Sequence, residues 1–222
     1  MKPVIRPLAA IAFALLAACS SQTYSTWTRV YDPPRQSSMK SKPTRVVKVT
    51  ADSFGCIRDM VPVRGFYVDN LLGDVADTLA AANHPYGGKW PPGSVVMRIP
   101  TEAMVKHGKG FNPATNDWEF FDLTVKGDAT RIRARGFTNV INQFGGNCLT
   151  CHSGAEPRWD MICESDHGCE SNRIPTVMAR AIQNSDPRCP KVSLPPDQKA
   201  ALQQFDAMRA AARGGGAVQA SR

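Results

Sequence analysis

The stretch DWEFFDLTVKGDATRIRAR, residues 117–135, predicts a β-hairpin and thereby the class of the fold. From 121 to 126, apolar and polar residues alternate, which is the period of a strand with one buried face. Trp118 and Phe120 lie in the opposite phase, so we expect either a bulge or a strand that is buried on both faces. A second alternating run at 130–135 follows after a Gly-Asp step, which is typical of a tight turn between antiparallel strands.

Further elements are expected on both sides of this hairpin. Short alternating runs predict strands at 46–49 and 94–99. Apolar residues at helical spacing predict helices at 69–83 and 174–184, and a third at 195–213 that begins on prolines and stops at a triple glycine. This order of elements predicts an α+β fold, with an antiparallel β-sheet core and flanking helices.

The stretch GGNCLTCHSG, residues 145–154, carries a C-x-x-C-H motif late in the chain. Cys148 and Cys151 are three residues apart, so one helical turn brings both thiols to the same side, where they can add to the two vinyl groups of a haem. His152 follows directly and supplies an imidazole nitrogen as iron ligand. The motif predicts one covalent haem c, with His152 as its metal ligand.

Two other interpretations of the motif are open. A zinc ion would draw its ligands from a cluster of cysteines and histidines in this part of the chain: Cys148, Cys151, His152, Cys163, His167 and Cys169. Zinc thiolates need reduced cysteines, however, and an oxidising compartment does not protect them. A short disulfide or redox pair is the third interpretation, although no βαβ pattern surrounds the motif.

The N-terminus predicts export and lipidation. Two basic residues precede an apolar run at 8–18, which is too short to span a bilayer but fits the hydrophobic region of a secretory signal. The sequence LAAC at 16–19 resembles the lipobox of bacterial lipoproteins, in which Cys19 becomes the lipidated first residue. Ser20, which is not Asp, favours the outer membrane. We therefore expect a signal peptide with a lipobox at 1–18 and a lipid-anchored protein on the periplasmic side of the bacterial outer membrane.

Composition divides the rest of the chain into three parts. Residues 19–45 are rich in Ser, Thr, Pro and basic residues, which predicts a lipidated tether. Residues 46–213 are long enough for one haem-binding domain, and 214–222 should be a disordered tail. The net charge is +8, but no basic patch with interleaved aromatic residues appears, so nucleic-acid binding is not expected.

The cysteine count is consistent with an exported protein. The chain has seven cysteines, and four remain once Cys19 and the two motif cysteines are set aside. The remaining four are candidates for two disulfides: Cys56, Cys163, Cys169 and Cys189. Four cysteines allow three connectivities, so the pairing stays open.

The chain resembles the cytochrome P-460 family, which includes the β-type cytochromes c′. The resemblance rests on a strand-rich domain that precedes a late haem motif, and on three stretches: PPGSVVMRIP at 91–100, DWEFFDL at 117–123 and NCLTCH at 147–152. RGFYVDNLLGD at 64–74 extends it upstream. The resemblance implies a β-rich fold with one haem, a proximal histidine, and a distal side open to hydroxylamine or nitric oxide.

One departure from the family concerns catalysis. In the hydroxylamine-oxidising members, a lysine on the glycine-led strand is cross-linked to the haem, and the present chain has Arg98 at this place. Lys106 and Lys109 are expected in the loop that follows. Activity as a hydroxylamine or nitric oxide oxidoreductase is therefore left open. Arg98 is either a haem-binding residue of the distal pocket or a solvated strand residue.

The sequence thus supports two classes of function. The first is a periplasm-facing mono-haem c-type cytochrome lipoprotein that binds small nitrogen ligands or transfers single electrons. Its candidate partners are a small nitrogen-containing ligand or a redox partner protein, the membrane through the lipid anchor, and a second copy in a homodimer. The alternative is a zinc- or disulfide-stabilised outer-membrane binding module without haem.

Overall fold

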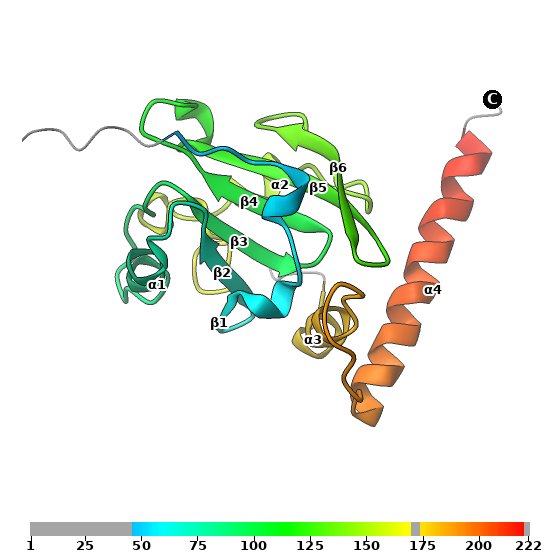
Figure 1. Cartoon of the computed structure of the whole chain (residues 1–222). Coiled ribbons are helices and arrows are strands. Elements are labelled where there is room, and N and C mark those ends of the chain that lie inside the picture. Colours follow the sequence, from blue (N-terminus) through cyan, green and yellow to red (C-terminus); the bar gives the residue numbers. More distant parts are fainter. Residues whose placement is uncertain (1–45, 170–173, 220–222) are drawn as a thin grey trace, which may run out of the picture. The chain divides into compact units, whose positions relative to one another are not determined.

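The computed structural model describes residues 46–169 and 174–219. The expected signal peptide at 1–18, the lipidation site Cys19, the tether at 19–45 and the last three residues of the expected tail lie outside the described residues. The described residues form six strands in one antiparallel sheet of order β1-β2-β3-β4-β5-β6 (Figure 1). The strands are β1 Val61–Val63, β2 Phe66–Asn70, β3 Ser94–Ile99, β4 Glu102–Lys106, β5 Trp118–Lys126 and β6 Ala129–Gly136.

The predicted hairpin is confirmed as β5 and β6. The pairing runs to Lys126 opposite Ala129, and Gly127 takes the left-handed backbone of the turn with φ of 60°. The register shifts between Asp122 and Leu123, which is the expected bulge. Both faces of β5 are also buried from Trp118 to Leu123. The opposite phase of Trp118 and Phe120 therefore reflects both a bulge and burial on both faces.

Helices flank the sheet, and the predicted α+β class is confirmed. The α-helices are α1 Val75–Ala82, α2 Cys148–His152, α3 Thr176–Asn184 and α4 Pro196–Gln219. Short 3-10 helices are η1 Ala51–Ser53, η2 Ile57–Asp59, η3 Pro113–Thr115 and η4 Pro157–Trp159. No helix in the described part of the chain is both long enough and apolar enough to span a bilayer.

Two predicted helix boundaries and one predicted strand are wrong, each for a physical reason. The helix expected at 69–83 begins only at Val75, because Asp69 and Asn70 pair with β3 as the end of β2. The run at 46–49 forms no strand, since its alternation reflects burial of Val47 and Val49 on the sheet. Helix α4 continues through the triple glycine to Gln219, because glycine weakens a helix without ending it.

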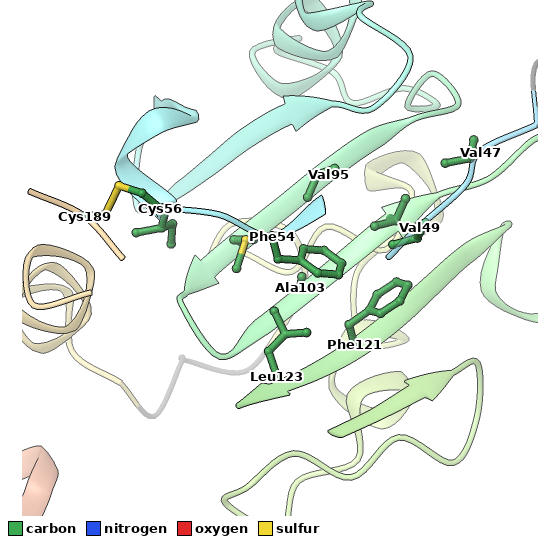
Figure 2. Close-up of a cluster of buried hydrophobic side chains, with 12 residues drawn as sticks. Val47, Val49, Phe54, Cys56, Val95, Ala103, Phe121, Leu123 and Cys189 are labelled. Carbon is green, nitrogen blue, oxygen red and sulfur yellow. A yellow bond between two sulfur atoms is a disulfide. The ribbon is translucent and has the colours of Figure 1, made fainter. Parts of the chain in front are cut away.

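One face of the sheet is covered by the chain that precedes β1. Figure 2 shows Val47, Val49 and Phe54 of this segment lying on Val95, Ala103, Phe121 and Leu123, all of them buried. The disulfide between Cys56 and Cys189 joins the segment to the chain between α3 and α4, with 4.8 Å between the Cα atoms.

The opposite face of the sheet, here called the motif face, carries helix α2. Its strand residues include Val96, Met104, Trp118 and Phe120, which are all buried. Cys148 and Leu149 of α2 pack against this cluster, together with buried residues of neighbouring loops: Trp90, Val140 and Ile162. The C-x-x-C-H motif therefore rests on the sheet itself.

The four cysteines predicted to form disulfides are confirmed in that role. The pairs are Cys56 with Cys189 and Cys163 with Cys169. The second pair, with 5.7 Å between its Cα atoms, closes a small loop a few residues after α2.

Candidate haem-attachment site

Helix α2 is short, and hydrogen bonds hold its N-terminal end. Asn147 caps its first turn, because its side-chain oxygen accepts from the backbone N–H of Thr150 at 3.0 Å. The Asn147 side-chain nitrogen donates to the Thr138 carbonyl at 2.8 Å, and the Cys148 N–H donates to the Val140 carbonyl at 3.0 Å. The motif is thus attached to the chain that leaves β6.

The two motif cysteines are both unpaired thiols. Cys148 is half-buried against the motif face, and Cys151 is exposed. Burial raises the pKa of Cys148 to about 12, and the nearby carboxylates of Glu102 and Asp122 add to this rise. Cys148 therefore carries its proton at neutral pH while no metal is bound.

The His152 imidazole is held in one orientation. Its Nδ1 lies 2.8 Å from the Met161 carbonyl oxygen, and its ring lies 5.2 Å from that of Phe120. A carbonyl oxygen only accepts hydrogen bonds, so Nδ1 carries the proton and the lone pair is on Nε2. Burial lowers the pKa of His152, which keeps the ring neutral at pH 7. Metal-ligating histidines are commonly held by such a bond from the other ring nitrogen.

These residues fit a covalently attached haem. Two unpaired thiols lie three residues apart on one helix, and the next residue presents a neutral imidazole whose Nε2 keeps its lone pair. In this arrangement His152 Nε2 would be the protein ligand of a haem iron. Across the described residues, no three or more His, Cys, Asp or Glu side chains form a group that could hold a metal ion by themselves.

The zinc interpretation loses two of its candidate ligands to a disulfide. Cys163 and Cys169 are bonded to each other, so neither sulfur is a thiolate. His167 is buried; its Nδ1 donates to the Ile162 carbonyl at 2.7 Å, and its Nε2 lies 3.7 Å from carboxylate oxygens of Glu164 and Asp166. The disulfide of the stapled-module alternative is present, but it does not involve the motif cysteines.

Arg98 belongs to β3, and its guanidinium faces a different neighbour. Its Nη2 donates to the Ile174 carbonyl at 2.9 Å, and its Nε is buried with no hydrogen-bond partner among the described residues. Burial lowers the pKa of Arg98. In the described part of the chain, no hydrogen bond or ion pair joins Arg98 to Cys148, Cys151 or His152, so a haem-binding role for Arg98 stays a prediction.

An acidic pair near Cys148 was not expected from the sequence. Glu102 and Asp122 face each other across β4 and β5. Burial and the neighbouring Asp122 raise the pKa of Glu102 to about 7. Glu102 accepts from the Asn142 amide at 2.9 Å, and Asp122 accepts from Arg133. Sequence spacing gives no signal for this pair, because strand register alone makes the two residues neighbours.

Lys106 lies in a different element from the one expected. It was expected in a loop, yet it ends β4, and its ammonium forms a buried ion pair with Asp160 at 2.6 Å. Burial lowers the pKa of Lys106. Asp160 directly precedes Met161, whose carbonyl accepts from His152. This ion pair therefore adjoins the histidine support.

A cavity of about 350 Å³ opens beside the start of α2. It is lined by residues of β6 and of the chain that follows, among them Ala134, Gly136 and Val140. Thr138 and Val140, both in its lining, also accept the hydrogen bonds from Asn147 and Cys148. The cavity is thus connected to the motif through these two backbone hydrogen bonds, while Cys148, Cys151 and His152 are not among its lining residues.

Comparisons of the chain with protein-family models, with curated proteins and with solved structures found no match.

Proposed function

We propose that the protein is a mono-haem c-type cytochrome lipoprotein that faces the periplasm and binds a small nitrogen-containing ligand. The observation that carries this proposal is the hydrogen bond from His152 Nδ1 to the Met161 carbonyl at 2.8 Å, beside two unpaired thiols on the same helix. The sequence features behind the compartment are the apolar run at 8–18 and the lipobox cysteine Cys19.

Each motif residue has a separate task in this proposal. Cys148 and Cys151 supply the thiols for the two thioether bonds, and His152 Nε2 supplies the proximal ligand. A bound haem would provide an iron that holds a diatomic or amine ligand or passes one electron. The bond from Nδ1 to the Met161 carbonyl fixes the tautomer and increases the electron density that the imidazole offers.

Ligand binding is favoured over electron transfer because no described side chain stands out as a second iron ligand. Met161 contacts the imidazole at Nδ1 through its own carbonyl, so its backbone lies beside the proximal histidine. His107 is buried, with its Nε2 2.9 Å from a Glu119 carboxylate oxygen, and His167 Nε2 faces carboxylate oxygens of Glu164 and Asp166 at 3.7 Å. Met104 is buried in the core of the motif face.

The test is to express the full chain together with the haem-attachment machinery. We expect a pyridine haemochrome spectrum of haem c and a haem-stained band on a denaturing gel. The double variant Cys148→Ala/Cys151→Ala should give no stained band. The variant Cys163→Ala/Cys169→Ala, which removes the neighbouring pair of cysteines, should keep the band. Absence of haem in the wild type, with zinc found by metal analysis, would support the alternative binding module.

The loaded protein then separates ligand binding from electron transfer. We expect a five-coordinate, high-spin ferrous spectrum that shifts when carbon monoxide is added. Met161→Ala should behave like the wild type, because the contact with His152 is made by a backbone carbonyl that alanine also has. A low-spin spectrum unmoved by carbon monoxide would instead assign the protein to electron transfer.

A further inference from the structure

The turn that follows η4 has an unusual backbone. Asp160 and Met161 have φ of 51° and 70°, so two consecutive non-glycine residues are left-handed. Such conformations cost about 1–3 kcal/mol each and persist only where the surroundings hold them. Asp tolerates this region better than most residues, but Met has no local reason to adopt it. Contacts from outside the turn must therefore hold it.

Those contacts converge on Asp160. One carboxylate oxygen, Oδ2, accepts from the Trp90 backbone N–H at 2.9 Å and from Lys106 Nζ at 2.6 Å. The Asp160 carbonyl accepts from the Trp118 indole N–H at 2.7 Å. The donors come from the chain before β3, from the end of β4 and from the start of β5. Asp160 is thus held by three separate parts of the sheet region.

The Lys106–Asp160 pair is hard to explain as a source of stability alone. The two side chains are 6% and 2% exposed, and replacing a buried ion pair by apolar residues is often neutral or stabilising. The second carboxylate oxygen, Oδ1, is buried and has no hydrogen-bond partner in the part of the chain that the structure describes. An unsatisfied buried atom of this kind costs stability and calls for a functional explanation.

The residue next to this anchored aspartate supplies that explanation. The Met161 carbonyl lies 2.8 Å from His152 Nδ1 and is the one hydrogen-bond partner of the imidazole among the described residues. We propose that Lys106 and Asp160 are positioning residues for His152, which hold the Met161 carbonyl so that the imidazole keeps its proton on Nδ1 and its lone pair on Nε2. The effect of this positioning on a haem iron rests on the proposed function, but the tautomer of His152 can be measured in the protein without haem.

The first test therefore uses the full chain produced without haem. Nitrogen-15 NMR of labelled histidines reports which ring nitrogen carries the proton, and His152→Gln assigns the signal among the four histidines. We expect the Nδ1–H tautomer in the wild type and a mixture of both tautomers in Asp160→Asn. An unchanged Nδ1–H signal in a folded Asp160→Asn would overturn the proposal.

The matched control is Asp186→Asn. Asp186 forms an equally buried ion pair with Arg188 at 2.8 Å, with side chains 0% and 2% exposed, and it bonds the Ile57 N–H instead of the motif region. This variant removes the same chemical group at similar burial, so it should leave the His152 tautomer unchanged. An equal change in both variants would show a general loss of packing and would also overturn the proposal.

A milder variant guards against misfolding. Asp160→Asn leaves the Lys106 charge without its partner, which is costly in the interior. Trp118→Phe keeps an aromatic ring and removes the indole N–H that bonds the Asp160 carbonyl, together with part of the buried ring, while it leaves the Lys106–Asp160 pair in place. We expect Trp118→Phe to increase the share of the Nε2–H tautomer of His152, as Asp160→Asn does. Trp159→Phe is its control, because the Trp159 indole N–H is buried without a partner in the described chain.

The haem-loaded protein gives the second readout. Without the Nδ1 hydrogen bond, the imidazole donates less electron density, so the ferrous form gains relative to the ferric form. We expect Asp160→Asn to shift the ratio of ferrous to ferric haem about tenfold, which is a rise of about 59 mV in the reduction potential of a one-electron couple. The iron–histidine stretching frequency should fall. Asp186→Asn should change neither the reduction potential nor the stretching frequency. A wild type that takes up no haem would refute the proposed function, whereas the tautomer measurement still decides the present inference.

Discussion

At the scale of single residues, the environment of Glu102 and of His152 determines what each can do. His152 ends α2 and Glu102 lies near Cys148 of the same helix, and burial acts on both in the direction of the neutral form. The carboxyl of Glu102 keeps its proton to a higher pH, and the imidazole of His152 loses its proton at a lower pH. The immediate surroundings of the motif are therefore less charged near neutral pH than the sequence implies.

Glu102 makes the stability of the protein depend on pH. Its pKa is about 7 in the folded state and 4.5 as the ordinary value, so the folded state keeps a proton that the unfolded state has lost between these values. Stability should consequently fall as pH rises from 4.5 through 7, by at most about 3 kcal/mol. We expect Glu102→Gln to remove this decline in urea unfolding measured at pH 5 and pH 8.

The control for this residue is Glu156→Gln. The Glu156 side chain is 48% exposed and pairs with Arg158 at the surface, where such pairs contribute little. Its free energy of unfolding should follow the wild-type pH profile. A Glu102→Gln protein that still lost the same stability between the two pH values would show that another group is responsible.

At the scale of elements, α2 depends on its cap more than on its length. A helix of five residues has little stability of its own, and the Asn147 side chain satisfies its first turn while also bonding the Thr138 carbonyl. Asn147→Ala should cost about 1 kcal/mol in the free energy of unfolding and should reduce the yield of attached haem. Thermal unfolding and haem staining per mass of protein would measure both effects.

Asn112 provides the matched control for this prediction. It caps η3 in the same way, accepting from the Ala114 N–H at 3.1 Å, and it does not bond the motif helix. Asn112→Ala should have a similar cost in stability, yet it should leave the yield of attached haem unchanged. Equal losses of haem in both variants would mean that the cap acts on folding in general.

At the scale of the whole molecule, the two disulfides have unequal effects. The bond between Cys56 and Cys189 joins residues 133 positions apart, whereas Cys163 and Cys169 are 6 apart. Because a cross-link stabilises mainly by restricting the unfolded chain, we expect Cys56→Ser/Cys189→Ser to cost about 5 kcal/mol and Cys163→Ser/Cys169→Ser about 2 kcal/mol. Denaturant unfolding of the two double variants measures this order directly. A larger loss from the shorter loop would show that local packing around α2 outweighs chain entropy.

The sequence by itself determined the hairpin at 117–135, the antiparallel sheet with flanking helices, the four disulfide cysteines and the C-x-x-C-H motif. These features follow from periodicity, turn chemistry and cysteine count, which are local or additive properties of the chain. Its errors arose where a local pattern had more than one physical cause. Alternation at 46–49 came from burial without strand pairing, and β2 continued into the run that was expected to be helical.

Only the tertiary structure decided which distant residues surround the motif. The Met161 carbonyl reaches His152, Lys106 reaches Asp160 across 54 positions, and Glu102 lies opposite Asp122. The pairing of the cysteines also depended on it. These contacts arise from strand register and from the left-handed turn at Asp160, which bring together residues far apart in the chain. No local pattern encodes them, because each depends on how separate segments pack on the same face of the sheet.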